Sequence, residues 1–224
     1  MSDNQAVSQE LLETIHELQQ LSSLSEFGLA GGTNLALRYG HRISVDIDLF
    51  SPSMIGIKGL ENICEQIKVE IMQNVPLLDE FEINDAIRMV TVKDIGVLKL
   101  KSLCSRMAKK DAYDLDLITD QKGYSLEELI DRYQEKETSF SSEADEWAFD
   151  LDEHPNPADD PKALLAFDET GYIAADNRPT HSDDQLNIIP SSKLYRVAKA
   201  SWRRKVRDYM SKRGFQLPPA KPVN

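Results

Sequence analysis

Apolar and polar residues follow two periods along the first 140 residues, and these periods predict helices interspersed with strands. Apolar residues recur at spacings of three and four, the pattern of a helix with one buried face, in residues 5–21, 33–39, 57–67 and 91–109. Short buried or alternating runs, the pattern of strands, occupy residues 27–30, 43–50, 67–72 and 87–92. This order predicts an α/β (α+β) domain with a small mixed sheet.

Only helices are expected after the last of these strands. Residues 109–120 continue or restart a helix, and Ser125 with Glu128 forms a capping box that predicts one more. Thr91 and Asp94 have the same spacing at the start of the preceding helix. The sheet is therefore predicted to be followed by a helical C-terminal half.

The character of the sequence changes twice beyond residue 138. A stretch rich in Pro, Asp and Asn has no sustained period and is typical of a loop or an extended arm. Order then returns in a basic amphipathic helix whose apolar stripe is Leu194, Ala198, Trp202, Val206 and Tyr209. We predict three parts: a core with a helical extension (1–138), an acidic arm (139–190), and a basic helix with a tail (191–224).

The net charge of −12 is unevenly distributed along the chain. Residues 143–186 carry 2 Lys and Arg against 13 Asp and Glu, whereas residues 191–214 carry 9 against 1. A polyanionic partner such as tRNA or another RNA would therefore be met locally, by Lys193 to Arg213. The alternative is intramolecular, with the basic helix docked on the acidic segment.

Composition argues against several classes of protein. The 224 residues contain no apolar run of about 18 residues and begin with a polar segment, so we expect neither a membrane span nor a signal peptide, and a cytoplasmic location. Two cysteines, Cys64 and Cys104, and four scattered histidines argue against a disulfide framework or a structural zinc site.

Residues 29–50 concentrate the candidate chemistry. Gly31 and Gly32 lie between a predicted strand and a helix, where bare backbone and unpaired amide groups can approach a phosphate, and Thr33 adds a hydroxyl. Asp46 and Asp48 lie two residues apart on the polar face of the next strand, where they can share a divalent cation. A phosphate site beside a cation site, Mg²⁺ or Mn²⁺, is what nucleotidyl transfer from an NTP requires.

Two further residues extend this set. Glu70 lies on the polar face of the following strand and is a candidate third carboxylate for the cation; otherwise it is a solvated side chain. Arg42, directly before the strand, is either a phosphate contact or a surface charge.

The stretch "LAGGTNLALRYGHRISVDIDLFS" resembles the first motif of the AbiEii/AbiGii toxin family. "TVKDIGVLKLKSLCSRMAKKDAYDLDLI", from Thr91 to Ile118, resembles the second half of the family's pattern, and the resemblance covers roughly residues 27–136. It implies a nucleotidyltransferase fold of the DNA polymerase β superfamily and the role of a toxin in type IV toxin-antitoxin or phage-abortive systems. It also implies an NTP substrate and a winged-helix antitoxin.

The resemblance assigns roles in the second motif. It makes Lys99 the nucleotide-contacting lysine and Arg106 the spaced arginine. It makes Asp111 catalytic, with Asp114 as its companion. The residues alone leave alternatives: Lys99 also fits a solvated helix face or a local salt bridge, and Asp114 fits a local cap or ion-pair partner. Asp111 either takes a proton from the acceptor hydroxyl or holds Lys99 or Arg106 in place.

Three functions therefore compete. The first is an enzyme that transfers a nucleoside monophosphate to RNA, with Asp46, Asp48, Lys99 and Asp111 as its catalytic residues. The second is a nucleotidyltransferase acting on a small molecule of the aminoglycoside kind, since an acidic surface suits a polycationic acceptor. The third is a catalytically idle nucleotidyltransferase fold that serves as a binding module.

Overall fold

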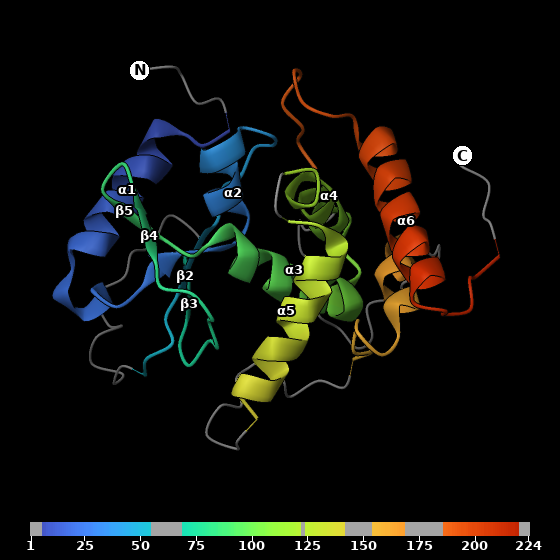
Figure 1. Ribbon diagram of the computed structural model, residues 1–224. Coiled ribbons are helices and arrows are strands. Elements are labelled where there is room, and N and C mark those ends of the chain that lie inside the picture. Colours follow the sequence, from blue (N-terminus) through green and yellow to red (C-terminus); the bar gives the residue numbers. More distant parts are fainter. Residues whose placement is uncertain (1–5, 55–68, 122–123, 142–153, 169–185, 220–224) are drawn as a thin grey trace, which may run out of the picture. The chain divides into compact units, whose positions relative to one another are not determined.

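The computed structural model describes residues 6–54, 69–121, 124–141, 154–168 and 186–219 (Figure 1). The chain forms two compact units. The first, here called the sheet unit, consists of Met1–Ile95, Lys136–Leu151 and Ile188–Ser192. The second, the helical unit, consists of Gly96–Glu135, Asp152–Asn187 and Lys193–Asn224. None of the helices in the described part of the chain is both long and apolar enough to traverse a lipid bilayer.

The sheet unit is built on a five-stranded mixed sheet with the strand order β3-β2-β1-β5-β4. Its strands are β1 (Gly28–Leu29), β2 (Ile47–Phe50), β3 (Val69–Met72), β4 (Glu82–Asn84) and β5 (Ile87–Met89). The central strand β1 runs antiparallel to β2 and parallel to β5, β2 is parallel to β3, and β4 is antiparallel to β5. The predicted small mixed sheet is therefore confirmed.

Helices α1 (Gln9–Gln20) and α2 (Gly31–Tyr39) pack against this sheet, α1 on β5 and α2 on β2. Helix α1 begins at Ser8, whose hydroxyl accepts a hydrogen bond from the amide of Leu11 at 3.2 Å. The short helix η1 (Ser22–Leu24) leads into β1. The core beneath these elements is fully buried and includes Ile15, Leu24, Phe27, Leu29, Leu35, Ile47 and Leu49.

The helical unit contains most of α3 (Val92–Arg106), all of α4 (Lys109–Ile118), α6 (Tyr195–Lys212) and η4 (Pro161–Asp168), and the larger part of α5 (Leu126–Ser139). Helix α6 packs along α4 and on η4. Its apolar stripe holds the fully buried Trp202, whose indole N–H donates a 3.0 Å hydrogen bond to the carbonyl of Leu164 in η4. The predicted helical half is confirmed, but Leu194 at the end of the stripe is 54% exposed.

One sequence prediction needs correction, one falls outside the described residues, and one strand was not predicted. The predicted strand 43–50 begins only at Ile47, since Ile43 and Val45 are exposed. The hairpin strand β4 was missed entirely. Residues 57–67, predicted as a helix, lie outside the described residues.

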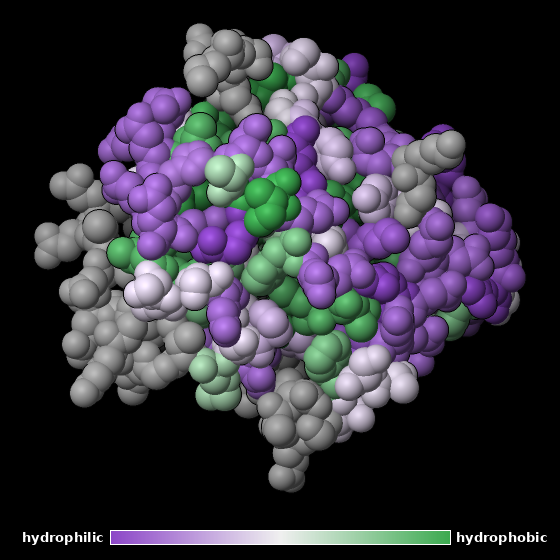
Figure 2. Space-filling view, turned by 60° about the vertical axis from the view of Figure 1, so that its left-hand side comes forward, coloured by the Kyte–Doolittle hydropathy of each residue, from purple (hydrophilic) through white to green (hydrophobic). Residues whose placement is uncertain are grey.

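On the face drawn in Figure 2, hydrophilic side chains predominate and hydrophobic ones form small groups between them.

Candidate active site

Helix α2 begins at Gly31, directly after β1, and the Asp48 carboxylate lies against this start. Gly31 has φ +62°, and a Cβ atom there would lie 1.8 Å from Oδ2 of Asp48. The Ala30 amide donates a 2.7 Å hydrogen bond to the carbonyl of Asp48, while the Ala30 side chain provides no cap. Only glycine fits at position 31, because both the backbone conformation and the nearby carboxylate exclude a side chain.

Gly32 also has a charged group close to it, the guanidinium of Arg42. A Cβ atom on Gly32 would lie 2.0 Å from Nη2 of Arg42, so the Arg42 guanidinium rests against the first turn of α2. Arg42 is only 7% exposed, and its backbone forms a bridge with Ile188. The surface-charge alternative for Arg42 is therefore wrong, and its charge lies where helix amide groups attract a phosphate.

Thr33 positions the backbone beside the aspartates. Its hydroxyl is hydrogen-bonded to the Ser44 hydroxyl at 2.9 Å and to the backbone carbonyl of Asp46, and Thr33 is completely buried. The expectation that Thr33 offers its hydroxyl to a phosphate needs correction for this reason: the group already anchors the segment that carries Asp46.

Asp48 and Glu70 are register partners on the parallel strands β2 and β3, so their side chains project from the same face of the sheet. Asp46 immediately precedes β2, and all three residues are partly exposed. These oxygen ligands and their shared face fit Mg²⁺ or Mn²⁺ by type. Within the described ranges, however, no three Asp, Glu, His or Cys residues are grouped closely enough to hold a metal ion. A cation would have to draw the three carboxylates together.

The second-motif residues form a compact charge cluster in the helical unit. Lys99 of α3 lies 2.8 Å from Oδ1 of Asp111 and 2.8 Å from Oδ2 of Asp114, both on α4. Arg106 donates to both oxygens of Asp111, at 2.7 and 2.9 Å. Both aspartates are fully buried, Lys99 is 6% exposed, and the Arg106 side chain is 41% exposed.

The surroundings of Asp111 determine its protonation. Burial by itself would raise the pKa of Asp111, but the charges and hydrogen bonds of Arg106 and Lys99 hold that pKa far below its usual range. A carboxylate with so low a pKa is a weak proton acceptor at neutral pH. Its contacts match the alternative in which Asp111 holds Lys99 and Arg106 in place.

The candidate residues thus fall into two groups, one in each unit. The sheet unit assembles Gly31, Gly32, Asp46, Asp48 and Glu70 around the start of α2. The helical unit assembles Lys99, Arg106, Asp111 and Asp114 between α3 and α4. Arg42 completes the first group. The sequence left its role open between two alternatives, because its approach to Gly32 depends on the tertiary fold.

Part of the basic helix is engaged within the helical unit. Lys193 and Lys205 both pair with Asp116 and Asp120, with distances of 2.6 Å and 2.8 Å to Asp116. Partial burial would raise the pKa of Asp120, but hydrogen bonds from the two lysines lower it. Arg213 pairs with Glu127 and Asp131 on α5, at 2.9 and 3.4 Å.

Of these acidic partners, Asp116 lies on α4, Asp120 follows just after its end, and Glu127 and Asp131 lie on α5. The acidic segment 143–186, on which the sequence alternative placed the basic helix, lies largely outside the described residues.

Comparison with known proteins gives three matches. Residues 16–76 match the family model described as nucleotidyl transferase AbiEii toxin, Type IV TA system. A relative from Aquifex aeolicus, the uncharacterized protein aq_aa25, is 28% identical over 148 residues, which cover 55% of this chain and 72% of that protein. The crystal structure of a candidate nucleotidyltransferase from H. pylori aligns with a TM-score of 0.48 at 14% identity, covering 92% of this chain and 96% of that chain.

The family match spans β1, α2, β2 and β3, and therefore the complete group of residues around the start of α2. The resemblance of this chain to the AbiEii nucleotidyltransferase toxins is confirmed over residues 16–76.

Proposed function

We propose that the protein is a nucleotidyltransferase that moves a nucleoside monophosphate from an NTP to an acceptor, with RNA as the acceptor class. The observation that carries the proposal is the start of α2, where Gly31 and Gly32 bring bare backbone between the Asp48 carboxylate and the Arg42 guanidinium. Helix amide groups and a guanidinium attract phosphate, while carboxylates attract the cation that accompanies a triphosphate.

Each residue of the group has a defined task in this proposal. Asp46 and Asp48, with Glu70 beside Asp48 in the register, would hold Mg²⁺ or Mn²⁺. The cation, when bound, offsets charge on the triphosphate and on the departing pyrophosphate. Arg42 and the first turn of α2 bind phosphate oxygens, and Thr33 fixes the backbone at Asp46.

Asp111 acts in this scheme as a positioning residue. It holds Arg106, the more exposed cation of its cluster, in place through two hydrogen bonds. Lys99 is held by two buried carboxylates, which offset its charge, and it fixes the position of Asp111.

The test incubates the protein with each of the four α-labelled NTPs, Mg²⁺ and total tRNA, followed by a denaturing gel. Wild type is expected to label the tRNA band, and the double variant Asp46→Ala, Asp48→Ala is expected to lose the label. Glu80→Gln is the matched control, since Glu80 is an exposed acid elsewhere in the sheet unit, and it should label tRNA like wild type.

Parallel arms replace tRNA with an aminoglycoside or with no acceptor. Label in the aminoglycoside alone would assign a small-molecule acceptor in place of RNA. Metal-dependent NTP binding without transfer in any arm would support the idle binding module and contradict the proposed reaction. A role as a toxin predicts that wild type, and not the double variant, arrests growth when expressed, and that a co-expressed winged-helix antitoxin relieves the arrest.

RNA binding is proposed for exposed cations of α6 that are not used in ion pairs with α4. Arg196 and Arg204 are exposed, and within the described residues neither has an ion-pair partner. Replacing both by Gln should weaken tRNA binding and reduce the slope of log K against log salt by about 1 for each phosphate that the variant no longer neutralises. An unchanged slope would contradict this surface.

A further inference from the structure

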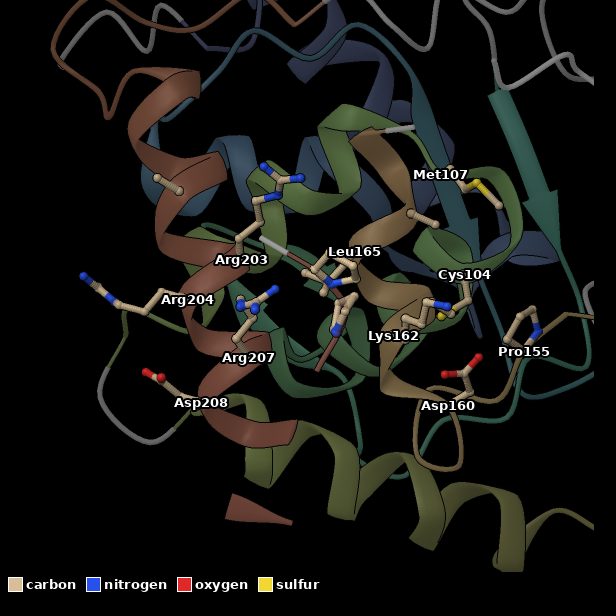
Figure 3. A pocket seen from close by; sticks show the side chains of 15 residues that line it. Cys104, Met107, Pro155, Asp160, Lys162, Leu165, Arg203, Arg204, Arg207 and Asp208 are labelled. Carbon is tan, nitrogen blue, oxygen red and sulfur yellow. The ribbon is translucent and has the colours of Figure 1, made fainter. Parts of the chain in front are cut away.

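A cavity of about 570 Å³ lies within the helical unit and belongs to neither group of candidate catalytic residues. It is lined by η4, α6, the end of α3 and residues 218–219 (Figure 3). Its volume is in the range of sites that hold a small organic molecule.

The cavity has a cationic wall supplied mainly by α6. Arg203 and Arg207 are four residues apart and so occupy one face of the helix, and in Figure 3 their guanidinium groups lie on the side of α6 that faces η4. Lys162 of η4 adds a third cation. Arg204 and Asp208 also line the cavity but extend to the other side of α6 in this view.

The residues that line the cavity carry more positive than negative charge. The lining contains four cations against two carboxylates, Asp160 and Asp208. In the described part of the chain Arg207 has no ion-pair partner. Like charges four residues apart on a helix repel each other, so an anion between Arg203 and Arg207 would relieve an unfavourable interaction.

The remaining walls are apolar. Leu165 and Ala166 of η4 and the pair Pro218 and Pro219 line the cavity, and Met107 lies at its far end. A ligand that fills this space needs an anionic group and an apolar or planar body. Guanidinium groups pair with oxyanions through two parallel hydrogen bonds and also stack on planar rings. Two arginines match the charge of about −1.5 to −2 on a phosphate monoester better than the single charge of a carboxylate.

We propose that this cavity binds an organic phosphate of mononucleotide size, with the phosphate held by Arg203 and Arg207 and the base lying on the wall of Leu165 and Pro218. The phosphate belongs either to a free nucleotide or to the 5′ end of an RNA chain. The site is independent of the proposed transfer reaction, whose cation-binding carboxylates belong to the sheet unit.

The test is isothermal titration of the full chain with AMP in the presence of EDTA, so that cation-dependent NTP binding at Asp46 and Asp48 does not contribute. Wild type is expected to bind one AMP, with adenosine and inorganic phosphate each at least tenfold weaker. Arg207→Gln should weaken AMP binding at least tenfold. Lys212→Gln, which replaces an exposed cation of the same helix outside the cavity, should bind AMP like wild type.

Absence of saturable AMP binding by folded wild type would overturn the proposal, and so would equal affinity in Arg207→Gln. Circular dichroism verifies that each variant is folded. Competition with RNA tetranucleotides identifies the source: displacement of AMP by the 5′-phosphorylated form alone assigns an RNA end, and no displacement assigns a free nucleotide.

The double variant Asp46→Ala, Asp48→Ala separates this site from the proposed function. It should bind AMP normally in EDTA whether or not the protein transfers nucleotides.

Discussion

Asp111→Asn is expected to destabilise the helical unit by about 3 kcal/mol. The substitution keeps the shape of the side chain but removes the buried negative charge that pairs with Lys99 and Arg106. Breaking a buried ion pair by removing one partner costs about 3–5 kcal/mol. The lower end applies here because Lys99 keeps its 2.8 Å contact with Asp114 and Arg106 is 41% exposed, hence partly screened by solvent.

The assay is urea unfolding followed by tryptophan fluorescence. A Trp147→Phe background leaves Trp202, which is buried in the helical unit, as the sole tryptophan, so the signal reports the unit that contains Asp111. Arg106→Gln is the matched comparison. It should cost only about 1 kcal/mol, because it removes the solvent-exposed partner and leaves Asp111 paired with Lys99.

The same variant has a pH signature. The pKa of Asp111 is lowered in the folded chain, so its contribution to stability is complete above the unfolded-state pKa of about 4 and is lost as the pH falls below it. The stability difference between wild type and Asp111→Asn should therefore be constant from pH 5 to 7 and shrink below pH 4. Breaking a buried ion pair typically costs about 3–5 kcal/mol. If wild type and Asp111→Asn differed in free energy of unfolding by less than about 0.5 kcal/mol at neutral pH, the ion-pair cluster would be refuted.

Three further predictions follow from local geometry. Gly31→Ala should lower the label transferred to tRNA at least tenfold in the gel assay, because the new Cβ would displace the Asp48 carboxylate. Alanine at φ +62° also costs about 1–2 kcal/mol of backbone strain. Transfer at the wild-type level would contradict this prediction. Ala86→Gly should raise the free energy of unfolding by up to about 1 kcal/mol, and with it the urea midpoint, because Ala86 has φ +63°. A lower midpoint would count against this turn. In a Cys64→Ser background, Cys104 should react with iodoacetamide at pH 8 only when the chain unfolds. Burial, and to a smaller extent the charge of Asp160, raise the pKa of the Cys104 thiol to about 12. Fast alkylation of the folded chain would contradict this prediction.

Predictions that depended on local chemistry agree with the structure. The Thr91 hydroxyl accepts from the Asp94 amide at 3.1 Å, and the Glu128 carboxylate accepts from the Ser125 amide at 2.7 Å. A capping box needs only residues three positions apart and a free helix start, so sequence spacing determines it.

Strand β4 could not be recognised in the same way. Its residues Glu82–Asn84 are all exposed, so no apolar face marks them as a strand. The turn to β5 passes through Asp85 and Ala86, both at positive φ, whereas the usual signal of such a tight turn is Asn-Gly or Asp-Gly. Pairing with β5 holds the strand in place despite its weak local preference.

The candidate site shows the same division between local and tertiary information. Spacing indicated that the glycines and aspartates of residues 29–50 would meet, because a strand, a helix and a second strand bring such residues to one end of a sheet. It did not reveal that Arg42 turns back on Gly32 or that Thr33 anchors Asp46. Those contacts depend on how the segment before β2 leaves the regular strand.

The residues of the basic helix differ in what they contact: some hold the helix to its neighbours, and others line the cavity or are exposed. Lys205 contacts Asp116, 89 residues earlier in the chain, and thereby fastens α6 to α4, while Trp202 fastens it to η4. Arg207 lines the cavity, and Arg196 is exposed. Deleting residues 191–224 would remove all of these contacts and part of the core at once. A loss of RNA binding in that deletion would therefore not identify a binding surface. Arg196→Gln and Arg207→Gln can separate the proposed RNA binding from the proposed nucleotide binding, because Arg196 lies outside the cavity, Arg207 lines it, and both substitutions leave Lys205 and the packing of Trp202 in place.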